Sequence, residues 1–257
     1  MNALVTGASS GIGREIARQL AERGYTVICC ARSRELLERL SDETGGMCRP
    51  LTVDLSEQAA SASVREHCLK QHLEIEVLVN CAGFGAVGHH VRHPAQTLAQ
   101  MCRLNVNTPS ELCALFGRDM RERRRGFILN VSSVAGFLPV PYFANYSASK
   151  AFILSLSESL HEELRPYGVR VCCLSPGPVR TRFHAVSNPN YSDDEKTVFS
   201  LSAEEVATAG LDGLFKGRRS VVPGLANRLC IWLEHLLPRS MVSRFLALKS
   251  EGRKLTH

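Results

Sequence analysis

A doubly wound α/β fold built on a parallel sheet is the architecture that this 257-residue chain predicts. Strand-like and helix-like segments alternate along the chain, which indicates repeated βαβ units. The apolar runs are short and continuous rather than alternating, as expected for parallel strands that helices cover on both faces. A glycine-rich turn separates the first strand from the first helix.

The first 80 residues contain three strand–helix units and a fourth strand. Each strand is predicted from a short apolar run such as V-I-C-C-A, and each helix from a longer segment with few helix breakers. The predicted strands cover residues 3–6, 26–31, 48–53 and 75–80, and the predicted helices cover residues 11–23, 35–43 and 56–72.

The alternation continues after a glycine-containing loop. A long helix ends in an arginine cluster whose cations complement the helix dipole, and a second long helix ends before Pro166 and Gly168. No repeat or linker interrupts the pattern, so one domain is expected. The predicted helices cover residues 94–124 and 142–164, and the predicted strands cover residues 127–131, 169–174 and 220–222.

The composition is ordinary for a globular protein, with 44% hydrophobic and 22% charged residues. No stretch approaches the ~18 to 20 unbroken apolar residues that a membrane span needs. Met1 is followed almost at once by the strand and turn A-L-V-T-G, which leaves no room for a signal peptide. We therefore expect a cytoplasmic protein.

The ten cysteines predict neither disulfides nor a metal site. Cys29–Cys30 and Cys172–Cys173 are adjacent pairs in predicted strands, where neighbouring side chains point to opposite faces. There is no C-x-x-C and no Cys/His cluster with zinc-finger spacing. We expect reduced thiols that act as small buried hydrophobes. His89, His90 and His93 are interpreted as a polar rim rather than as metal ligands.

Tyr146 and Lys150 lie four residues apart in Y-S-A-S-K and therefore share one face of their predicted helix. A tyrosine with a pKa near 10 transfers protons poorly at neutral pH, whereas one beside a fixed positive charge ionises more easily. Such a pair can act as a general acid or base toward a carbonyl or an alcohol. Alone the motif is weak, because this spacing recurs on many solvated helix faces.

The glycine turn predicts a dinucleotide site. T-G-A-S-S-G-I-G follows the first strand and opens the first helix, which is the required context. Gly7 permits the tight turn, Gly11 lets the backbone approach a pyrophosphate, and Gly13 lets the helix pack on the sheet. The helix N-terminus then offers unpaired N–H groups to the phosphates.

The end of the second strand predicts the cofactor. NAD-binding sheets place an Asp or Glu there for the ribose 2′-hydroxyl, but this chain has Ala31 followed by Arg32, with Arg34 close by. An arginine can bind a 2′-phosphate through its fork of donors, so NADP(H) is favoured over NAD(H). Asp54, at the end of the third strand, could accept from the amino group of adenine.

Together these motifs resemble the short-chain dehydrogenase/reductase family over nearly the whole chain. N-C-A-G at 80–83 is similar to the family's N-N-A-G, with Cys81 in place of the second asparagine, a departure that we interpret as tuning of the loop. Asn105 in L-N-V-N and Ser133 in N-V-S-S-V-A-G match two further positions of the catalytic set. S-P-G-P-V-R-T at 175–181 matches the segment that lines the nicotinamide.

The resemblance implies a reaction and a set of residues. Tyr146 would transfer a proton to or from the substrate oxygen, Lys150 would help Tyr146 ionise and bind the nicotinamide ribose, and Ser133 would hold the substrate oxygen. Asn105 would support a water relay to Lys150. The cofactor residues expected are Gly7, Ser9, Ser10, Gly11, Ile12, Gly13, Arg32, Arg34, Asp54, Leu55, Asn80, Ala82, Gly83, Tyr146, Lys150, Pro176, Gly177, Val179 and Thr181.

The substrate pocket is expected in the loops over residues 84–93, 134–142 and 178–199, and the polar stretch 187–196 reads as a mobile lid. Aromatic and aliphatic side chains there indicate a hydrophobic ketone or alcohol, which could be a steroid or bile acid, a fatty-acyl ketone or a xenobiotic ketone. The alternative is a non-catalytic NADP-binding sensor or scaffold. The substrate residues expected are Phe84, Ser133, Phe137, Val140, Tyr142, Tyr146 and Phe183.

The C-terminal tail carries most of the positive charge. Residues 214–257 contain nine Lys/Arg against two Glu, a net charge of +7, and apolar residues recur there at helical spacing on either side of Pro238. We expect a dinucleotide-binding catalytic domain over residues 1–224 and an amphipathic basic helical extension over 225–257. Packing on the domain or on a second subunit of a homodimer or homotetramer is favoured for this stripe. A membrane surface or an acidic carrier is the alternative, and nucleic acid is not expected.

Overall fold

A computed structural model, which describes residues 1–179 and 200–251, contains one seven-stranded sheet in which every strand is parallel to its neighbours. The strand order is β3-β2-β1-β4-β5-β6-β7, and helices cover both faces, as predicted. The strands are β1 (Asn2–Thr6), β2 (Thr26–Ala31), β3 (Cys48–Thr52), β4 (Ile75–Asn80), β5 (Gly126–Val131), β6 (Val169–Leu174) and β7 (Ser220–Val221).

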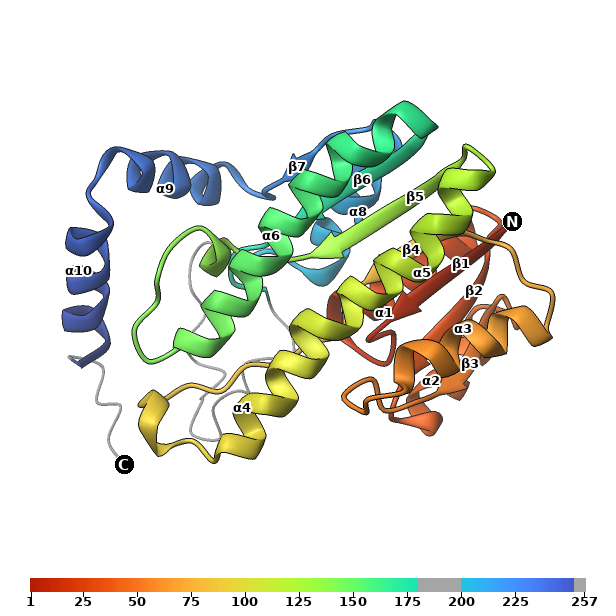
Figure 1. Ribbon diagram of the computed structural model, residues 1–257, viewed down its shortest axis with the longest axis horizontal. Helices are drawn as coiled ribbons and strands as arrows, with labels where there is room; N and C mark the ends of the chain where they lie inside the picture. The colour runs from red at the N-terminus through yellow and green to blue at the C-terminus, as the bar shows by residue number, and fades with distance from the viewer. Residues whose placement is uncertain (180–199, 252–257) are drawn as a thin grey trace.

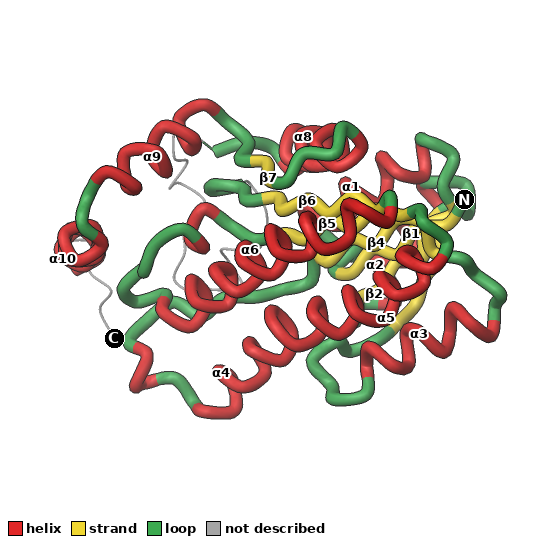
Figure 2. The backbone as a smooth tube through the Cα atoms, turned by 45° about the horizontal axis from the view of Figure 1, so that its top comes forward, coloured by secondary structure: helices red, strands yellow, loops and turns green. Residues whose placement is uncertain are grey.

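The helices form two layers around this sheet (Figure 2). Buried side chains of α1, α2 and α8 join one core cluster, and those of α3 and α5, with α6 packed beside them, join the other. The helices are α1 (Gly11–Glu22), α2 (Arg34–Glu43), α3 (Ala60–Lys70), α4 (Ala95–Cys102), α5 (Thr108–Glu122), α6 (Ala144–Leu164), α8 (Ala203–Phe215), α9 (Leu225–Leu236) and α10 (Arg239–Glu251).

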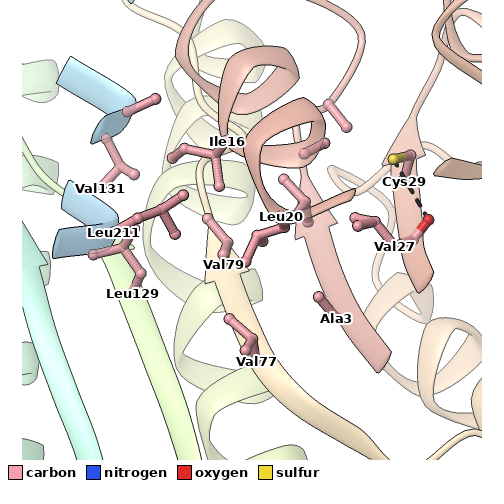
Figure 3. Packing of buried hydrophobic residues seen from close by; sticks show 14 of the residues in the cluster. Ala3, Ile16, Leu20, Val27, Cys29, Val77, Val79, Leu129, Val131 and Leu211 are labelled. Atoms are coloured by element: carbon pink, nitrogen blue, oxygen red, sulfur yellow. Dashed lines mark hydrogen bonds between the residues drawn. The ribbon is translucent and has the colours of Figure 1, made fainter. Parts of the chain in front are cut away.

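Each strand supplies residues to both cores because successive side chains point to opposite faces. In Figure 3, Ile16 and Leu20 of α1 point down onto Val79 and the other strand residues of the first cluster. The adjacent pair Cys29 and Cys30 divides as predicted, with Cys29 in the first cluster and Cys30 in the second. All ten cysteines are free thiols, and seven of them are buried; Cys81 and Cys102 are partly buried, and Cys230 is exposed.

The strand order reverses direction between β1 and β4. The chain moves outward from β1 to β3 on one side and from β4 to β7 on the other. In an open parallel sheet the crevice at this switch point lies beyond the carboxyl ends of the strands and receives the ligand. The turns after β1, β4 and β5 therefore meet at one place in the fold.

Two elements differ from the sequence-based expectation. α8 was not predicted, although Ser202 and Glu205 form a reciprocal capping box at its start, with hydrogen bonds of 3.1 and 2.8 Å. The helix expected over 94–124 is interrupted by a π-helical turn at Arg103–Asn107 that joins α4 to α5. Periodicity alone cannot reveal one extra residue in a turn.

The tail forms the two helices that the pattern on either side of Pro238 predicted, and they project beyond the carboxyl ends of the strands (Figure 1). The prediction that the stripe packs on its own domain is wrong, because Leu225, Leu229 and Trp232 are 81%, 57% and 60% exposed. Packing on a second subunit stays a prediction. No helix within residues 1–179 and 200–251 has the length and hydropathy needed to cross a bilayer.

Candidate active site

The glycine turn leaves a cradle at the amino end of α1. Gly7 has φ of +70°, and a Cβ on it would lie 2.9 Å from the Cα of Ala82. A Cβ on Gly13 would lie 2.4 Å from the carbonyl oxygen of Gly7. Only glycine allows α1 to pack this closely on the turn. The backbone N–H groups at the start of α1 are therefore open to an anionic group, and the site fits a pyrophosphate.

The hydroxyl of Thr6 connects this turn to the neighbouring loop. Its oxygen accepts hydrogen bonds from the backbone N–H of Cys81 at 3.0 Å and of Ala82 at 3.1 Å, and it donates to the carbonyl of Val79 at 3.2 Å. The loop is therefore anchored through its backbone. Replacement of an asparagine by Cys81 leaves that anchor in place, in agreement with its interpretation as tuning.

The ends of β2 and β3 carry an arginine and a carboxylate. Oδ1 of Asp54 accepts from the backbone N–H of Ser56 at 2.9 Å and from its hydroxyl at 2.6 Å, and these bonds lower the pKa of the Asp54 carboxyl. Arg32 is exposed at the edge of the cavity and adds to this effect. Arg34 is instead paired with Glu38 at 2.7 Å and does not line the cavity, contrary to expectation.

Asn105 lies in the π-helical turn and anchors the loop after β4. Its side chain accepts from the backbone N–H of Phe84 at 3.1 Å and donates to the carbonyl of Phe84 at 2.9 Å and to the hydroxyl of Ser149 at 3.1 Å. A Cβ on Gly83 would lie 3.0 Å from Oδ1 of Asn105 and 3.5 Å from Nζ of Lys150. The extra residue of the π turn thus brings Asn105 beside the lysine.

Ser133, Tyr146 and Lys150 converge at the carboxyl end of β5. Nζ of Lys150 donates to the carbonyl of Val131 at 2.9 Å and lies 5.7 Å from the centre of the Tyr146 ring. The hydroxyl of Ser133 accepts from the backbone N–H of Ala135 at 3.2 Å and hydrogen-bonds the phenol of Tyr146. The site therefore presents a serine hydroxyl, a phenol and an ammonium group together.

Burial has the largest effect on the pKa values of Tyr146 and Lys150. Desolvation raises the pKa of Tyr146 to about 12, although the hydrogen bond from Ser133 acts in the opposite direction. Burial also lowers the pKa of Lys150. The ammonium group of Lys150 donates to the carbonyl of Val131. The i,i+4 spacing suggested that Lys150 would ease ionisation of the phenol, but burial raises the pKa of Tyr146 and has the larger effect. At neutral pH Tyr146 therefore holds its proton and can donate it.

A cavity of about 640 Å³ joins the glycine turn to this group. Most of the residues expected to bind the cofactor line this cavity, but not all of them. Asn80 does not line it, and its amide donates to Oδ1 of Asn130 at 2.8 Å. Thr181, Phe183 and the stretch 187–196 lie outside the described residues. The expected residues that do line it are Gly7, Ser9, Ser10, Gly11, Ile12, Gly13, Arg32, Asp54, Leu55, Ala82, Gly83, Phe84, Ser133, Tyr146, Lys150, Pro176, Gly177 and Val179.

The substrate end of the cavity differs from expectation. Phe137, Val140 and Tyr142 do not line it, whereas Phe143 does. The ring of Phe143 stacks on that of Tyr146, with centroids 4.2 Å apart. Its position three residues before Tyr146, at the start of the same helix, could have identified it. Leu104 also lines the cavity and was not predicted, whereas Val134 and Ala135 line it from the loop 134–142 in which the pocket was expected.

Comparison with known proteins agrees with this geometry. A family model described as short chain dehydrogenase matches residues 1–192. A very-long-chain 3-oxoacyl-CoA reductase from Anas platyrhynchos is 32% identical over 252 residues, which cover 95% of this chain and 78% of the relative.

Solved structures show the same fold. A short-chain dehydrogenase from Sphingobium yanoikuyae in complex with NADPH is 29% identical, with a TM-score of 0.80 and coverage of 100% of this chain and 98% of that one. A bulky-bulky ketone specific alcohol dehydrogenase from Comamonas testosteroni is 30% identical, with a TM-score of 0.76 and coverage of 100% and 96%.

Proposed function

The chain belongs to the short-chain dehydrogenase/reductase family, and we propose that it is an NADP(H)-dependent oxidoreductase that interconverts a hydrophobic ketone and a secondary alcohol. One observation carries this proposal: a continuous cavity is lined both by the glycine turn and by Ser133, Tyr146 and Lys150. A nucleotide bound on the turn would extend along this cavity toward the phenol.

We assign the following roles. NADP(H), when bound, supplies or accepts the hydride. In reduction, Tyr146 donates its phenolic proton to the substrate oxygen, and Ser133 hydrogen-bonds the same oxygen and offsets its developing charge. Lys150 holds positive charge near the phenol and binds the ribose of the cofactor. Asn105 is a positioning residue, because it holds the loop at Phe84 and lies beside Lys150.

The preference for NADP(H) over NAD(H) rests on Arg32. Its side chain lies at the cavity edge, beyond the end of β2, where Ala31 provides no carboxylate to repel a phosphate. Arg32 makes no hydrogen bond or ion pair with another described side chain, so its donors are available to a 2′-phosphate.

Replacing Arg32 with alanine should weaken NADP(H) binding by about 10- to 100-fold, since hydrogen bonds to a charged group contribute about 1.5–3 kcal/mol. NAD(H) binding should change little. Fluorescence titration of both reduced cofactors measures the two effects. Arg34→Ala is the matched control, because Arg34 is paired with Glu38 away from the cavity and should leave both affinities unchanged. Equal affinities of the native protein for NADPH and NADH would contradict the proposed preference.

The apolar substrate end supports a hydrophobic ketone. Phe84, Leu104 and Phe143 line the cavity near Tyr146 and provide no charge to bind a polar substrate. Among relatives, a 3-oxoacyl-CoA reductase and a bulky ketone alcohol dehydrogenase act on carbonyl compounds, as their names state. Both fit the same reaction class.

The experiment that tests the function is NADPH oxidation, followed at 340 nm, with three groups of ketones: ketosteroids, 3-ketoacyl thioesters and aromatic ketones. We expect turnover with at least one group and little turnover with small hydrophilic ketones. Tight NADPH binding without turnover of any ketone, or of the matching alcohols with NADP⁺, would favour the non-catalytic sensor instead.

A further inference from the structure

An apolar stripe on α9 and α10 faces solvent. Inward-facing side chains such as Ile231 and Val242 are only 9% and 8% exposed, whereas the outward apolar side chains are 46% to 81% exposed. Isolated exposed hydrophobes are normal, but eight of them within residues 225–248 mark an interaction site. The members, here named the tail stripe, are Leu225, Leu229, Trp232, Leu233, Leu237, Met241, Phe245 and Leu248.

Cations border the tail stripe on both helices. Arg228 is three residues after Leu225 and four before Trp232, so it lies beside the stripe on α9. Arg244 has the same relation to Met241 and Leu248 on α10. Within the described part of the chain, neither arginine forms an ion pair, although Nε of Arg228 donates to the carbonyl of Val222 at 2.8 Å. Arginines in the domain commonly do form ion pairs, as in Arg65–Asp119 at 2.7 Å and Arg103–Glu111 at 3.0 Å.

The tail stripe begins at the wall of the cavity. Asn227, in the first turn of α9, packs on Gly177, where an added Cβ would lie 2.5 Å from its amide. Gly177 and its neighbours Pro176 and Pro178 line the cavity. Figures 1 and 2 show α9 and α10 standing away from the body of the fold, on the side toward which the strands point.

We propose that α9 and α10 dock on the surface of an anionic lipid bilayer, with the tail stripe among the lipid chains and the bordering arginines at the headgroup phosphates. An apolar strip with a tryptophan and flanking cations is the pattern of helices that lie in the plane of a membrane interface. Residues 225–257 contain six Lys/Arg against two Glu, and this net charge of +4 adds attraction to an anionic surface.

The charge pattern also favours a bilayer over two other possible partners, a second copy of this chain and an acidic protein. A two-fold contact between copies of this chain would bring two strongly basic tails together, with only two glutamates in each to offset them. An acidic protein would need cations across the face, whereas here apolar groups fill the centre and cations stand at the edges. A bilayer satisfies both parts of the pattern.

Docking also has a consequence that rests on the proposed function. Because α9 packs on Gly177, a docked tail holds the cavity close to the lipid. Hydrophobic ketones concentrate in the bilayer and would reach the cavity from there. Vesicle binding is measured without turnover, so the docking proposal and the proposed activity can fail separately.

The test is co-sedimentation of the full chain with vesicles made of phosphatidylglycerol and phosphatidylcholine in equal parts. We expect binding that weakens with added salt and is much weaker on pure phosphatidylcholine. Changing Arg228, Arg239 and Arg244 to glutamine should weaken binding roughly a hundredfold, at about fivefold per cation. The matched control changes Arg118, Arg121 and Arg124, three exposed arginines at the carboxyl end of α5, to glutamine and should leave binding within about twofold of native.

A second variant tests how much the apolar side chains of the tail stripe contribute to vesicle binding. Leu229→Ser with Trp232→Ser should weaken binding at least tenfold, whereas Leu69→Ser with Val91→Ser, two exposed hydrophobes outside the tail, should not. Sedimentation velocity without lipid measures the oligomeric mass of the native chain and of every variant. The proposal is overturned if the native chain does not bind anionic vesicles, or binds neutral ones equally. A change of oligomeric mass in the Leu229 and Trp232 variant, without vesicle binding by native protein, would assign the stripe to a second copy instead.

Discussion

Turnover of the Tyr146→Phe variant is expected to be at least a hundredfold below native, while NADP(H) binding stays within about threefold of it. Loss of a positioned general acid commonly costs about 10²- to 10⁴-fold. Phenylalanine keeps the ring that stacks on Phe143 at 4.2 Å and removes only the hydroxyl. The effect should therefore fall on kcat rather than on cofactor affinity. Steady-state kinetics with the best ketone of the panel and cofactor titration measure the two quantities.

A matched tyrosine in the same chain serves as control. The hydroxyl of Tyr167 bonds to the guanidinium of Arg121 at 3.1 Å on a different surface, so Tyr167→Phe should retain native turnover. Because burial holds the pKa of Tyr146 at about 12, the native phenol stays protonated across the neutral range. Reduction should then lose no activity between about pH 6 and 9 through ionisation of this phenol, and alcohol oxidation should speed up as pH rises. Native-like turnover of Tyr146→Phe would remove Tyr146 from the proton path.

The order of the fold is predictable because each strand and helix carries its own local signal. The strands 75–80 and 169–174 have the predicted bounds, since each is a mainly apolar segment that ends at a polar residue. α8 was not predicted, although S-A-E-E at 202–205 is a capping-box pattern and the structure forms the capping box. The π-helical turn at Arg103–Asn107 has no such signal, because it shifts the register without changing the residue types.

The part of the site that was predictable consists of motif residues that themselves line the cavity. The glycines of the first turn and the pair Tyr146 and Lys150 line one cavity because backbone geometry brings them there. The bond from Asn80 to Asn130 was not predictable, because its partner lies on the neighbouring strand, 50 residues away in sequence. Arg34 is paired with Glu38 four residues later, and this i,i+4 pattern was visible in the sequence. Proximity in sequence to a motif does not determine the direction of a side chain.

The tail shows a second limit of pattern reasoning. Apolar residues at helical spacing indicate that one face of a helix differs from the other, and such a face most often packs inward. In α9 it is the opposite face, with Ile231, that is buried, while Trp232 faces outward. Only the placement of the helix against the domain decides between these two orientations, and that depends on contacts distant in sequence, such as Asn227 with Gly177.

Gly13→Ala is expected to weaken NADP(H) binding at least tenfold and to lower the free energy of unfolding by about 1–3 kcal/mol, the usual range for overpacking. The new methyl group would lie 2.4 Å from the carbonyl oxygen of Gly7 and 3.3 Å from Sγ of Cys81. Gly7 has no room to retreat, because it already lies against the backbone of Ala82. Either α1 or the turn must therefore move, and each movement displaces the N–H groups proposed to bind the pyrophosphate.

Gly117→Ala is the matched substitution with the opposite expected sign. A Cβ on Gly117 would lie 3.7 Å from Ile128 and 3.8 Å from Leu164, which is ordinary contact, and the residue is inside α5. Alanine there should leave cofactor binding unchanged and raise the free energy of unfolding by up to about 1 kcal/mol, the difference in helix propensity. Thermal unfolding with and without NADPH measures both variants. The Gly13→Ala protein should gain less stability from NADPH than the native chain does. An equal gain would mean that the phosphates bind elsewhere, because the added methyl group must displace this turn.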